Sequence, residues 1–316
     1  MRIGILSTAR INHSILTAAS STDAAEVVAV GSRDLGRALE YAREHGLERA
    51  HGSYEALLDD PAVDAVYVSL PNSLHAEWSR RALEAGKHVL CEKPLGRRPD
   101  DVERAFEVAA ERGLVLMEAF MYRHHPQTHA LVQCIASGRI GELRQLRTSF
   151  TSTLEDPDDV RLRPELDGGA LMDLGCYCVD VARLLAGEPE VVFGRQRLAP
   201  TGVDVGFTGV LAFANDVFAE FHCAFDLPAE SGLEAIGAAG RVLVREPFTC
   251  SDPHLELNGE RIDVDDANRY QLQLENFAAA ARGDAEPLLG RDDGVAQART
   301  VDALYRSAMT GAGVSL

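Results

Sequence analysis

The chain has 316 residues, 46% of them hydrophobic and 25% charged, and its formal net charge is −18. This length and composition are typical of a globular protein with room for two domains and a large buried core. The acidic balance argues against nucleic acid or an anionic membrane surface as the main partner, because both favour an excess of lysine and arginine.

Membrane, secretory and metal-binding segments are not expected. No apolar run reaches the ~18 residues of a membrane span, and residues 1–5 indicate a first strand rather than a secretory leader. The cysteines lack the spacing of a disulfide framework, which is typical of a reduced, cytoplasmic protein. Cys176 and Cys178 would point to different sides of a helix with no second Cys/His pair nearby, so we predict no metal site.

The first 120 residues alternate between short apolar strands and helices. Strands are predicted at 3–6, 27–30, 64–70, 88–91 and 114–118, and helices at 11–20, 35–44, 54–58, 73–84 and 99–110. Gly46 suits the position just after the second helix, where a left-handed conformation is common. Repeated β–α units of this length predict a doubly wound parallel sheet.

From about residue 122 the pattern changes to longer alternating strands. A helix is predicted at 127–137, strands at 143–152, 191–198, 203–214, 218–225 and 234–237, and a last helix at 271–281. Gly, Asp and Asn separate these strands, as in an antiparallel or mixed sheet. The sequence therefore predicts an α/β protein with a dinucleotide-binding domain over 1–121 and a second domain over 122–316.

Two short segments carry residues that the local structure does not need. The strand at 88–91 runs directly into Glu92-Lys93-Pro94, which leaves an ammonium at a carboxyl end, where open α/β sheets bind ligands. Asp173 and Tyr177 are spaced i,i+4, so a helix would place both on one face. A lysine, a tyrosine and an aspartate that converge on a cofactor can move a proton while a hydride moves elsewhere. The pattern favours a nicotinamide-dependent oxidoreductase.

The first strand–helix turn lacks the usual glycines of a dinucleotide fingerprint. Ser7, Ala9 and Asn12 occupy the three glycine positions, but all are small enough for a close approach to a pyrophosphate. The hydroxyls of Ser7 and Thr8 can donate to phosphate, and the following helix N-terminus attracts anions. The predicted cofactor contacts of this turn are Ser7, Thr8, Ala9, Arg10 and Ile11.

The second strand ends in Gly31-Ser32-Arg33-Asp34. An NAD-selective site would place an acid here to bind the ribose 2′-hydroxyl, whereas a hydroxyl and a guanidinium suit a 2′-phosphate. Asp34 could pair with Arg33 and weaken this preference, and a surface arginine at a strand end is the plain structural alternative. Ser32 and Arg33 therefore favour NADP(H) as the cofactor, with NAD(H) still open.

These motifs, taken together and in this order, resemble the glucose–fructose oxidoreductase/inositol dehydrogenase (Gfo/Idh/MocA) family over nearly the whole chain. Further matching segments are Pro71-Asn72-Ser73-Leu74-His75, Ala119-Phe120-Met121-Tyr122-Arg123-His124-His125-Pro126 and Ser137-Gly138-Arg139-Ile140-Gly141-Glu142-Leu143. The resemblance implies a Rossmann domain followed by an α/β domain on a large, mostly antiparallel sheet. Such a sheet often serves as an oligomer interface, so a homodimer or homotetramer is expected.

The resemblance also assigns roles to individual residues. It implies that Lys93 lies by the nicotinamide and the reacting carbon, with Glu92 beside it. It implies that the segment with Leu70, Pro71, Asn72 and His75 runs under the nicotinamide ribose. It places Arg123, and less directly Arg161, near the cofactor. Asp167 stands where related sequences often carry another glycine.

Tyr177 ends the motif Asp173-Leu174-Gly175-Cys176-Tyr177, where many members of the family have histidine. The tyrosine version is similar to the branch with dihydrodiol dehydrogenases, pyranose or xylose dehydrogenases and some nucleotide-sugar ketoreductases. A free tyrosine titrates near pH ~10, and a neighbouring Lys93 ammonium would favour its phenolate. Tyr177 is thus predicted to be the acid/base on the substrate oxygen, Lys93 to stabilise that oxygen, and Asp173 to bind a neighbouring hydroxyl or orient Lys93.

The predicted function is NADP(H)-dependent hydride transfer at a secondary alcohol or ketone of a sugar, nucleotide sugar or cyclic polyol, in a pocket facing the Tyr177 helix. Two alternatives stay open: an NAD-retaining glycosidase of the same fold, and a non-catalytic nucleotide-sensing protein. The residues also have plain interpretations. Lys93 can be a solvated charge, Tyr177 a buried helix tyrosine, and Asp173 a local cap.

Overall fold

A computed structural model describes residues 1–316 and divides the chain into two compact units. The first unit comprises Met1–His124 and Asn268–Val295, and the second comprises His125–Ala267 and Ala296–Leu316. Each unit is thus assembled from two stretches of chain. None of the helices combines the length and apolar composition needed to cross a membrane.

The first unit contains a parallel sheet of six strands in the order β3-β2-β1-β4-β5-β6. Its strands are β1 (Arg2–Leu6), β2 (Glu26–Gly31), β3 (Arg49–His51), β4 (Ala65–Val68), β5 (His88–Cys91) and β6 (Leu116–Glu118). Its helices are α1 (Asn12–Ala19), α2 (Leu35–His45), α3 (Tyr54–Leu58), η1 (Asn72–Leu74), α4 (His75–Glu84), α5 (Pro99–Arg112), η2 (Met121–His124) and α8 (Arg269–Arg282). The predicted doubly wound parallel sheet is confirmed. The short strand β3 was not predicted.

The strands of this sheet end level with one another. Leu6 pairs in register with Gly31 and with Val68, Val68 pairs with Cys91, and Cys91 pairs with Glu118. The residues that follow β1, β2, β4 and β5 therefore leave the sheet at one edge. The strand order reverses between β1 and β4, and open α/β sheets bind ligands outside the carboxyl ends at such a switch point.

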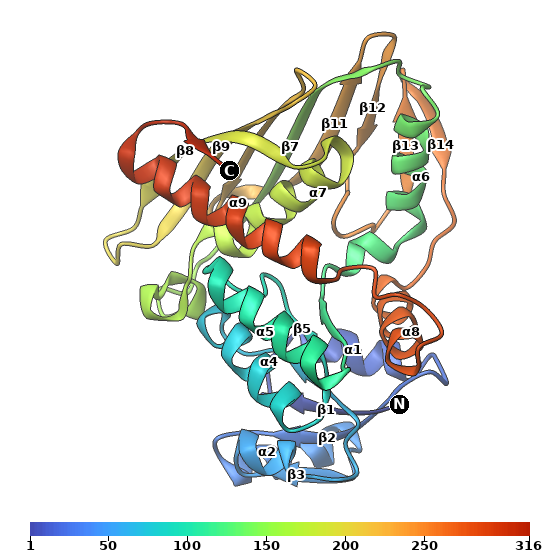
Figure 1. Ribbon diagram of the computed structural model, residues 1–316, viewed down its shortest axis with the longest axis vertical. Coiled ribbons are helices and arrows are strands. Elements are labelled where there is room, and N and C mark those ends of the chain that lie inside the picture. The colour runs from blue at the N-terminus through green and yellow to red at the C-terminus, as the bar shows by residue number, and fades with distance from the viewer. The chain divides into compact units, whose positions relative to one another are not determined.

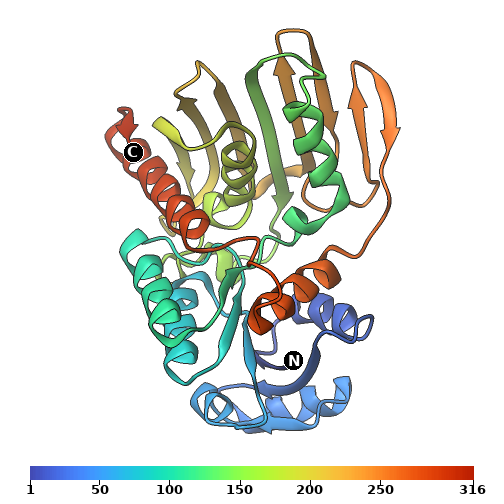
Figure 2. The same cartoon turned by 45° about the vertical axis from the view of Figure 1, so that its right-hand side comes forward.

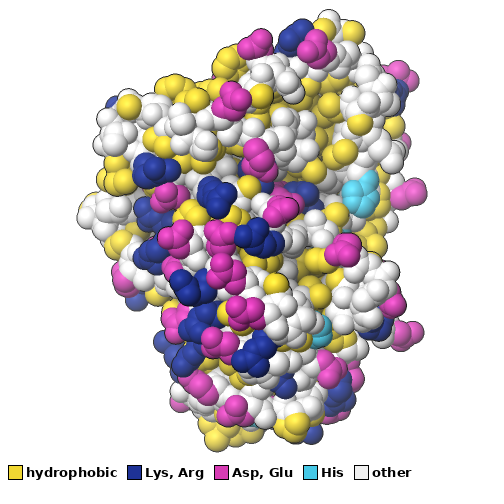
Figure 3. Space-filling view, in the orientation of Figure 1, with side chains coloured by type: hydrophobic (Ala, Val, Ile, Leu, Met, Phe, Trp, Pro, Cys, Tyr) yellow, Lys and Arg dark blue, Asp and Glu magenta, His cyan; other side chains and the backbone are white.

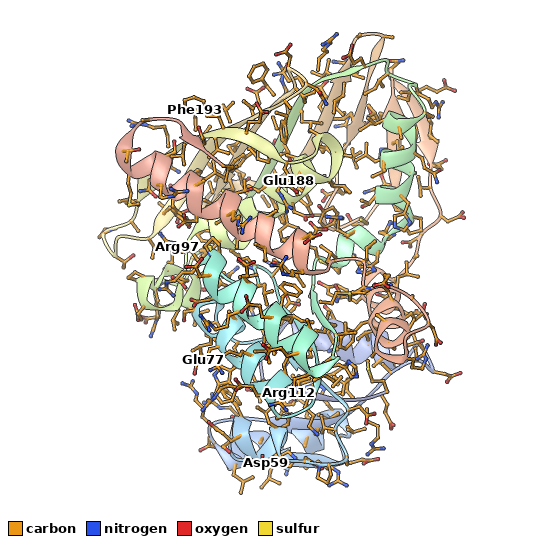
Figure 4. All side chains as sticks on the ribbon, in the orientation of Figure 1. Asp59, Glu77, Arg97, Arg112, Glu188 and Phe193 are labelled. Carbon is orange, nitrogen blue, oxygen red and sulfur yellow. The ribbon has the colours of Figure 1, made fainter.

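Helices cover both faces of the six-stranded sheet. α4 and α5 pack against each other on one face, and α8 packs beside α1 on the other (Figures 1 and 2). α2 ends at Gly46, whose φ of 68° is the predicted left-handed conformation. Glu77 lies in the first turn of α4 and Arg112 in the last turn of α5, the ends at which each charge is favoured by the helix dipole (Figure 4).

The exposed face of α4 and α5 carries charges of both signs. Figure 3 shows acidic and basic side chains intermingled over these helices. Arg80 pairs with Glu84, and Arg81 lies 3.1 Å from Glu55. The acidic excess of the chain is therefore not concentrated into one single-signed patch on this face.

The second unit contains a nine-stranded sheet in the order β14-β13-β12-β11-β7-β10-β9-β8-β15. Its strands are β7 (Leu143–Thr153), β8 (Pro189–Leu198), β9 (Asp204–Phe213), β10 (Phe218–Ala224), β11 (Asp226–Gly237), β12 (Gly240–Val244), β13 (His254–Leu257), β14 (Glu260–Asp263) and β15 (Val314–Ser315). Only the β10–β7 pair is parallel, so the predicted mostly antiparallel sheet is confirmed. The strands β12 to β15 were not predicted.

Helices of the second unit lie on one side of this sheet. They are α6 (Pro126–Ala136), α7 (Cys176–Ala186) and the part of α9 (Arg291–Thr310) that starts at Ala296. Figures 1 and 2 show α6 and α7 in front of the same face of the strands. The helix α9 was not predicted.

The opposite face of the nine-stranded sheet is polar with exposed aromatic rings. It holds a hollow of about 510 Å³ whose lining includes Arg147, Thr208, Glu220 and His222. Phe193 on β8 pairs in register with Val210, two residues along β9 from Thr208, so its half-exposed ring lies on this same face (Figure 4). We call this surface the open sheet face.

Candidate active site

The turn after β1 holds Ser7 in a conformation that usually requires glycine. Its φ is 116°, and its N–H donates to Gly31 O at 2.9 Å, which closes the turn against β2. The Ser7 hydroxyl lies 3.0 Å from Ser69 O and accepts the N–H of Ala9 at 3.1 Å. Asn12 donates from Nδ2 to Ser7 O at 2.9 Å. The hydroxyl predicted to reach a phosphate is therefore engaged within the turn itself.

The other predicted residues of this turn lead directly into α1. Thr8, Ala9, Arg10 and Ile11 connect β1 to the helix, and no side chain caps the helix N-terminus at Ile11. The first N–H groups of a helix have no partner within it, and their dipole attracts anions. In α1 the N–H groups of Asn12, His13 and Ser14 donate to the backbone carbonyls of the three residues before the helix at 3.0–3.2 Å. The dipole of the helix start, rather than free N–H groups, therefore favours a pyrophosphate at the position that the fingerprint predicts.

The end of β2 presents two arginines. Ser32 is buried, whereas Arg33 and Arg37 are exposed. The Asp34 carboxylate accepts the Arg37 N–H at 2.7 Å and so caps α2. Burial raises the pKa of Tyr54, and the neighbouring Arg33 and Arg37 guanidiniums oppose that shift. Arg33 and Arg37 thus both lie near the hydroxyl of Tyr54.

Sequence reasoning missed Arg37. A signal was present, because a basic residue in the first turn of a helix opposes the helix dipole and so has no local stabilising role there. Two guanidiniums beside a buried serine hydroxyl suit a dianionic phosphate.

The residues around Lys93 are tightly tied to neighbouring elements. Glu92 is buried and accepts a hydrogen bond from the Tyr67 hydroxyl, which burial and the adjacent carboxylate keep protonated by raising its pKa. His75 is 1% exposed, and its ring nitrogens lie 2.8 Å from Pro94 O and 2.7 Å from Leu70 O.

Both ring nitrogens of His75 therefore contact backbone carbonyls of the protein. The predicted role of His75 was a contact with the cofactor. Burial lowers the pKa of His75, and the two carbonyl contacts oppose that shift. Pro71 caps the short helix η1, which begins at Asn72, so both residues directly precede the helix that starts with His75. The Lys93–Pro94 peptide bond is cis.

Two residues from the C-terminal stretch of the first unit, Tyr270 and Asp293, lie next to predicted site residues. Tyr270 of α8 is near Glu92 and Lys93: burial and Glu92 raise its pKa, and Lys93 lowers it. Arg123, predicted near the cofactor, is 8% exposed and donates to Asp293 Oδ2 at 3.2 Å. Sequence reasoning missed Tyr270, because only the packing of α8 brings it close to Lys93.

In the second unit, Asp173 and Tyr177 lie at the junction of two helical segments. Residues Leu171–Gly175 form a π-helix that continues into α7, and such widened turns occur frequently at functional sites. Tyr177 is 6% exposed, and its ring packs against Phe150 and Phe248 at centroid distances of 5.5 and 5.2 Å. The phenol is therefore held in a rigid aromatic cluster.

Arg161 faces Asp173 from the preceding loop. Its Nη1 lies 3.4 Å from Asp173 Oδ2, and its Nε and Nη2 donate to Asp159 at 2.9 and 2.8 Å. The hydrogen bond with Asp159 and the charge of Asp173 raise the pKa of Arg161, against its partial burial. Asp167, at the position where glycine is common, adopts φ of 50°.

The predicted site residues form two groups. The first unit brings together the Ser7 turn, Ser32-Arg33, Leu70-Pro71 and Glu92-Lys93 at one sheet edge, and the second unit brings together Asp173, Tyr177 and Arg161. The cysteines are all buried and form no disulfide, and no group of three or more His, Cys, Asp and Glu side chains could hold a metal ion.

We expect Arg161→Met to lower kcat/KM roughly tenfold through KM and to leave the Kd for NADPH nearly unchanged. The reason is that Arg161 neutralises and orients Asp173, which we expect to bind a substrate hydroxyl. Steady-state kinetics and NADPH titration measure both quantities. A selective rise in the NADPH Kd would instead support the cofactor contact, and Arg163→Met, at an exposed neighbour, is the matched control.

Gly175→Ala is expected to destabilise the protein by about 1–3 kcal/mol through overpacking. An added Cβ would lie 2.7 Å from Cys223 Sγ and 2.8 Å from a Leu171 methyl carbon. Denaturant unfolding measures the loss, with Gly232→Ala as control because its Cβ would meet only Ser149 Oγ at 3.5 Å. Equal stability of the two variants would contradict the tight packing of the π-helix.

Comparison with known protein families gives two matches that together span most of the chain. The profile described as "Oxidoreductase family, NAD-binding Rossmann fold" matches residues 1–120. The profile of the "GFO/IDH/MocA C-terminal domain" matches residues 128–243. The two profiles follow each other in the order that the sequence motifs predict.

Similar proteins include D-xylose 1-dehydrogenase (NADP(+)) 2 of Haloferax volcanii, which is 38% identical and matches over 100% of both chains. Trans-1,2-dihydrobenzene-1,2-diol dehydrogenase of Oryctolagus cuniculus is 38% identical over 75% of this chain and 72% of its own. A 3-ketoreductase of Actinomadura kijaniata, solved in complex with NADP and TDP-benzene, is 35% identical over 97% of both chains with a TM-score of 0.92. With both profiles matched and the predicted motifs in place, the chain belongs to the Gfo/Idh/MocA oxidoreductase family.

Proposed function

We propose that this protein is an NADP(H)-dependent oxidoreductase that transfers a hydride between the nicotinamide and a secondary alcohol or ketone of a sugar, nucleotide sugar or cyclic polyol. The observation that carries the proposal is that Lys93 follows β5 at the sheet edge where the Ser7 turn and Ser32-Arg33 also emerge. The named relatives are a D-xylose dehydrogenase, a dihydrobenzenediol dehydrogenase and a 3-ketoreductase, and they support a hydroxyl- or keto-bearing ring as substrate.

The chain offers a fitting set of groups for NADP. Ser7 has a positive φ of the kind that glycine allows in a fingerprint turn, and the dipole at the N-terminus of α1 suits the pyrophosphate. Arg33 and Arg37 would hold the 2′-phosphate, with Ser32 beside them, since Asp34 is used as a helix cap. When bound, the nicotinamide supplies the hydride donor or acceptor.

We propose that Tyr177 transfers the proton and that Lys93 stabilises the negative charge on the reacting oxygen. Tyr177 would take the hydroxyl proton during oxidation or return it to the alkoxide during reduction. The Lys93 ammonium would stabilise the negative oxygen and favour the phenolate of Tyr177. Asp173, oriented by Arg161, would accept a hydrogen bond from a neighbouring substrate hydroxyl.

The two parts of the chain take different tasks in this proposal. Residues 1–121 bind the dinucleotide, and residues 122–316 bind the substrate and form a homodimer or homotetramer. Support for self-association comes from the open sheet face, on which Phe193 and Phe218 are about half exposed among polar side chains. The absence of disulfides among the cysteines supports a reducing, cytoplasmic location.

Parallel calorimetric titration with NADPH and NADH tests the cofactor assignment. Tight and selective NADPH binding supports the proposal, and a panel of ketosugars and aldoses then tests turnover by absorbance at the nicotinamide band. Equal or absent binding of both nucleotides would contradict the Ser32-Arg33 assignment. If a nicotinamide is instead released only after denaturation, and sugar is cleaved without added NADP, the glycosidase alternative replaces the reductase.

A further inference from the structure

The residues on both sides of Lys93 are held by buried side chains from other elements. On the N-terminal side, the hydroxyl of Tyr67 in β4 donates to the Glu92 carboxylate, and the Glu92 N–H donates to Val68 O at 2.9 Å. Tyr67 has no exposed surface. The backbone and the side chain of Glu92 are therefore both attached to β4 directly before the lysine.

On the C-terminal side, two consecutive residues are attached in the same way. His75, the first residue of α4, places Nδ1 2.8 Å from Pro94 O. Glu118, the last residue of β6, accepts the N–H of Leu95 on Oε1 at 2.7 Å and is 2% exposed. The chain that follows Lys93 is thus tied to a helix and to the neighbouring strand.

We propose that Tyr67, His75 and Glu118 are positioning residues that fix the orientation of Lys93, an inference that rests on the proposed role of Lys93 at the substrate oxygen. We call these three side chains the Lys93 cradle. They come from β4, α4 and β6, so the backbone around Lys93 is constrained from three separate elements.

The chemistry of lysine explains why such a cradle is needed. An ammonium on a four-carbon stem has many rotamers and no preferred hydrogen-bond plane, so its direction depends on the backbone that carries it. Catalytic groups must be held within about 0.5 Å of the productive geometry by supporting contacts. The Cys91–Glu92 and Pro94–Leu95 peptide groups, one on each side of the lysine, are held by hydrogen bonds to other elements.

His75 adds a link to the predicted cofactor segment. Its Nε2 lies 2.7 Å from Leu70 O while Nδ1 contacts Pro94 O. One buried ring therefore joins the Leu70-Pro71 segment, expected under the nicotinamide ribose, to the residue after Lys93. A displacement of this ring would therefore shift Lys93 relative to the segment that is expected under the nicotinamide ribose.

The kinetic test uses Tyr67→Phe, His75→Leu and Glu118→Leu. We expect kcat to fall roughly 10- to 100-fold in each, since small misplacements of catalytic groups have effects of this size. We expect a larger isotope effect with NADPH deuterated at the transferred position, because hydride transfer becomes more rate-limiting. The Kd for NADPH should be nearly unchanged in Tyr67→Phe and Glu118→Leu, and it should rise in His75→Leu, which also releases the Leu70-Pro71 segment.

Conservative variants separate positioning from general loss of stability. His75→Asn places an amide donor where Nδ1 lies and Glu118→Gln keeps an oxygen acceptor, so both should recover most of kcat. The control is His254→Leu, which removes another buried histidine whose Nδ1 contacts a backbone carbonyl, Asp252 O, at 2.7 Å. The inference is overturned if the cradle variants lose kcat no more than this control at equal stability.

A second measurement tests the cradle without turnover. The chain contains only two lysines, Lys87 and Lys93, so lysine labelled with ¹³C at Cε gives two NMR signals, assigned by Lys93→Met. We expect Tyr67→Phe and His75→Leu to shift or broaden the Lys93 signal and to leave the Lys87 signal in place. An unmoved Lys93 signal would overturn the positioning role, whereas a wild-type protein that turns over no substrate would overturn the proposed function alone.

Discussion

Lys93→Met is expected to lower kcat roughly 10³- to 10⁴-fold, because in the proposed mechanism Lys93 both stabilises the charge on the reacting oxygen and favours the phenolate of Tyr177. The methionine has a similar length, and Lys93 is only partly buried, so the fold should be preserved. The Kd for NADPH should be nearly unchanged. Steady-state kinetics with a substrate found in the panel, together with calorimetry, measure both quantities.

The other lysine provides a matched control with the opposite outcome. Lys87 is buried, and its Nζ donates to Asp60 O at 2.8 Å and to Val63 O at 2.7 Å. Lys87→Met leaves both carbonyls without this donor and should cost about 2–4 kcal/mol of stability with kcat of the folded protein preserved. If the Lys93→Met variant retained activity, this result would contradict the proposed mechanism and favour the sensing alternative.

Arg33→Ala is expected to weaken NADPH binding roughly 10- to 100-fold, which corresponds to the loss of a charge-assisted hydrogen bond to phosphate. NADH, which lacks the 2′-phosphate, should bind almost as before. Arg37→Ala should show a smaller effect in the same direction, because it leaves Arg33 in place. The loss should shrink at high ionic strength, since both side chains are exposed.

Two variants on the same helix control for this result. Arg43→Ala removes a guanidinium from the last turn of α2, away from Arg33, and should leave both nucleotide affinities unchanged. Asp34→Asn keeps a capping side chain and removes a carboxylate, so NADPH should bind equally or more tightly. If Arg33→Ala weakened NADH and NADPH equally, Arg33 would contact the shared adenosine part rather than the 2′-phosphate.

Alternating β–α units and period-two strands were enough to predict the type of both sheets, although not the strands β3 and β12 to β15. Local sequence patterns succeeded for β1, β4 and β5 because these strands are buried on both faces and so appear as short apolar runs, whereas the polar and more exposed β3 was missed. The strands β13 and β14 have four residues each and form a hairpin at the edge of the sheet, so they leave little periodic signal. α9 was missed although Val295, Ala298 and Val301 recur at helical spacing, so that signal was available.

The sequence by itself determined the chemical groups of the candidate site. Lys93 after a strand, the Ser32-Arg33 pair and the Asp173–Tyr177 spacing are local patterns, and local patterns survive folding because strand ends and helix faces are set by nearby residues. Only the tertiary structure decided which side chains support them. Tyr67, His75 and Glu118 meet the residues flanking Lys93 because β4, α4 and β6 pack around β5, and hydrogen bonds between segments remote in sequence leave no periodic trace.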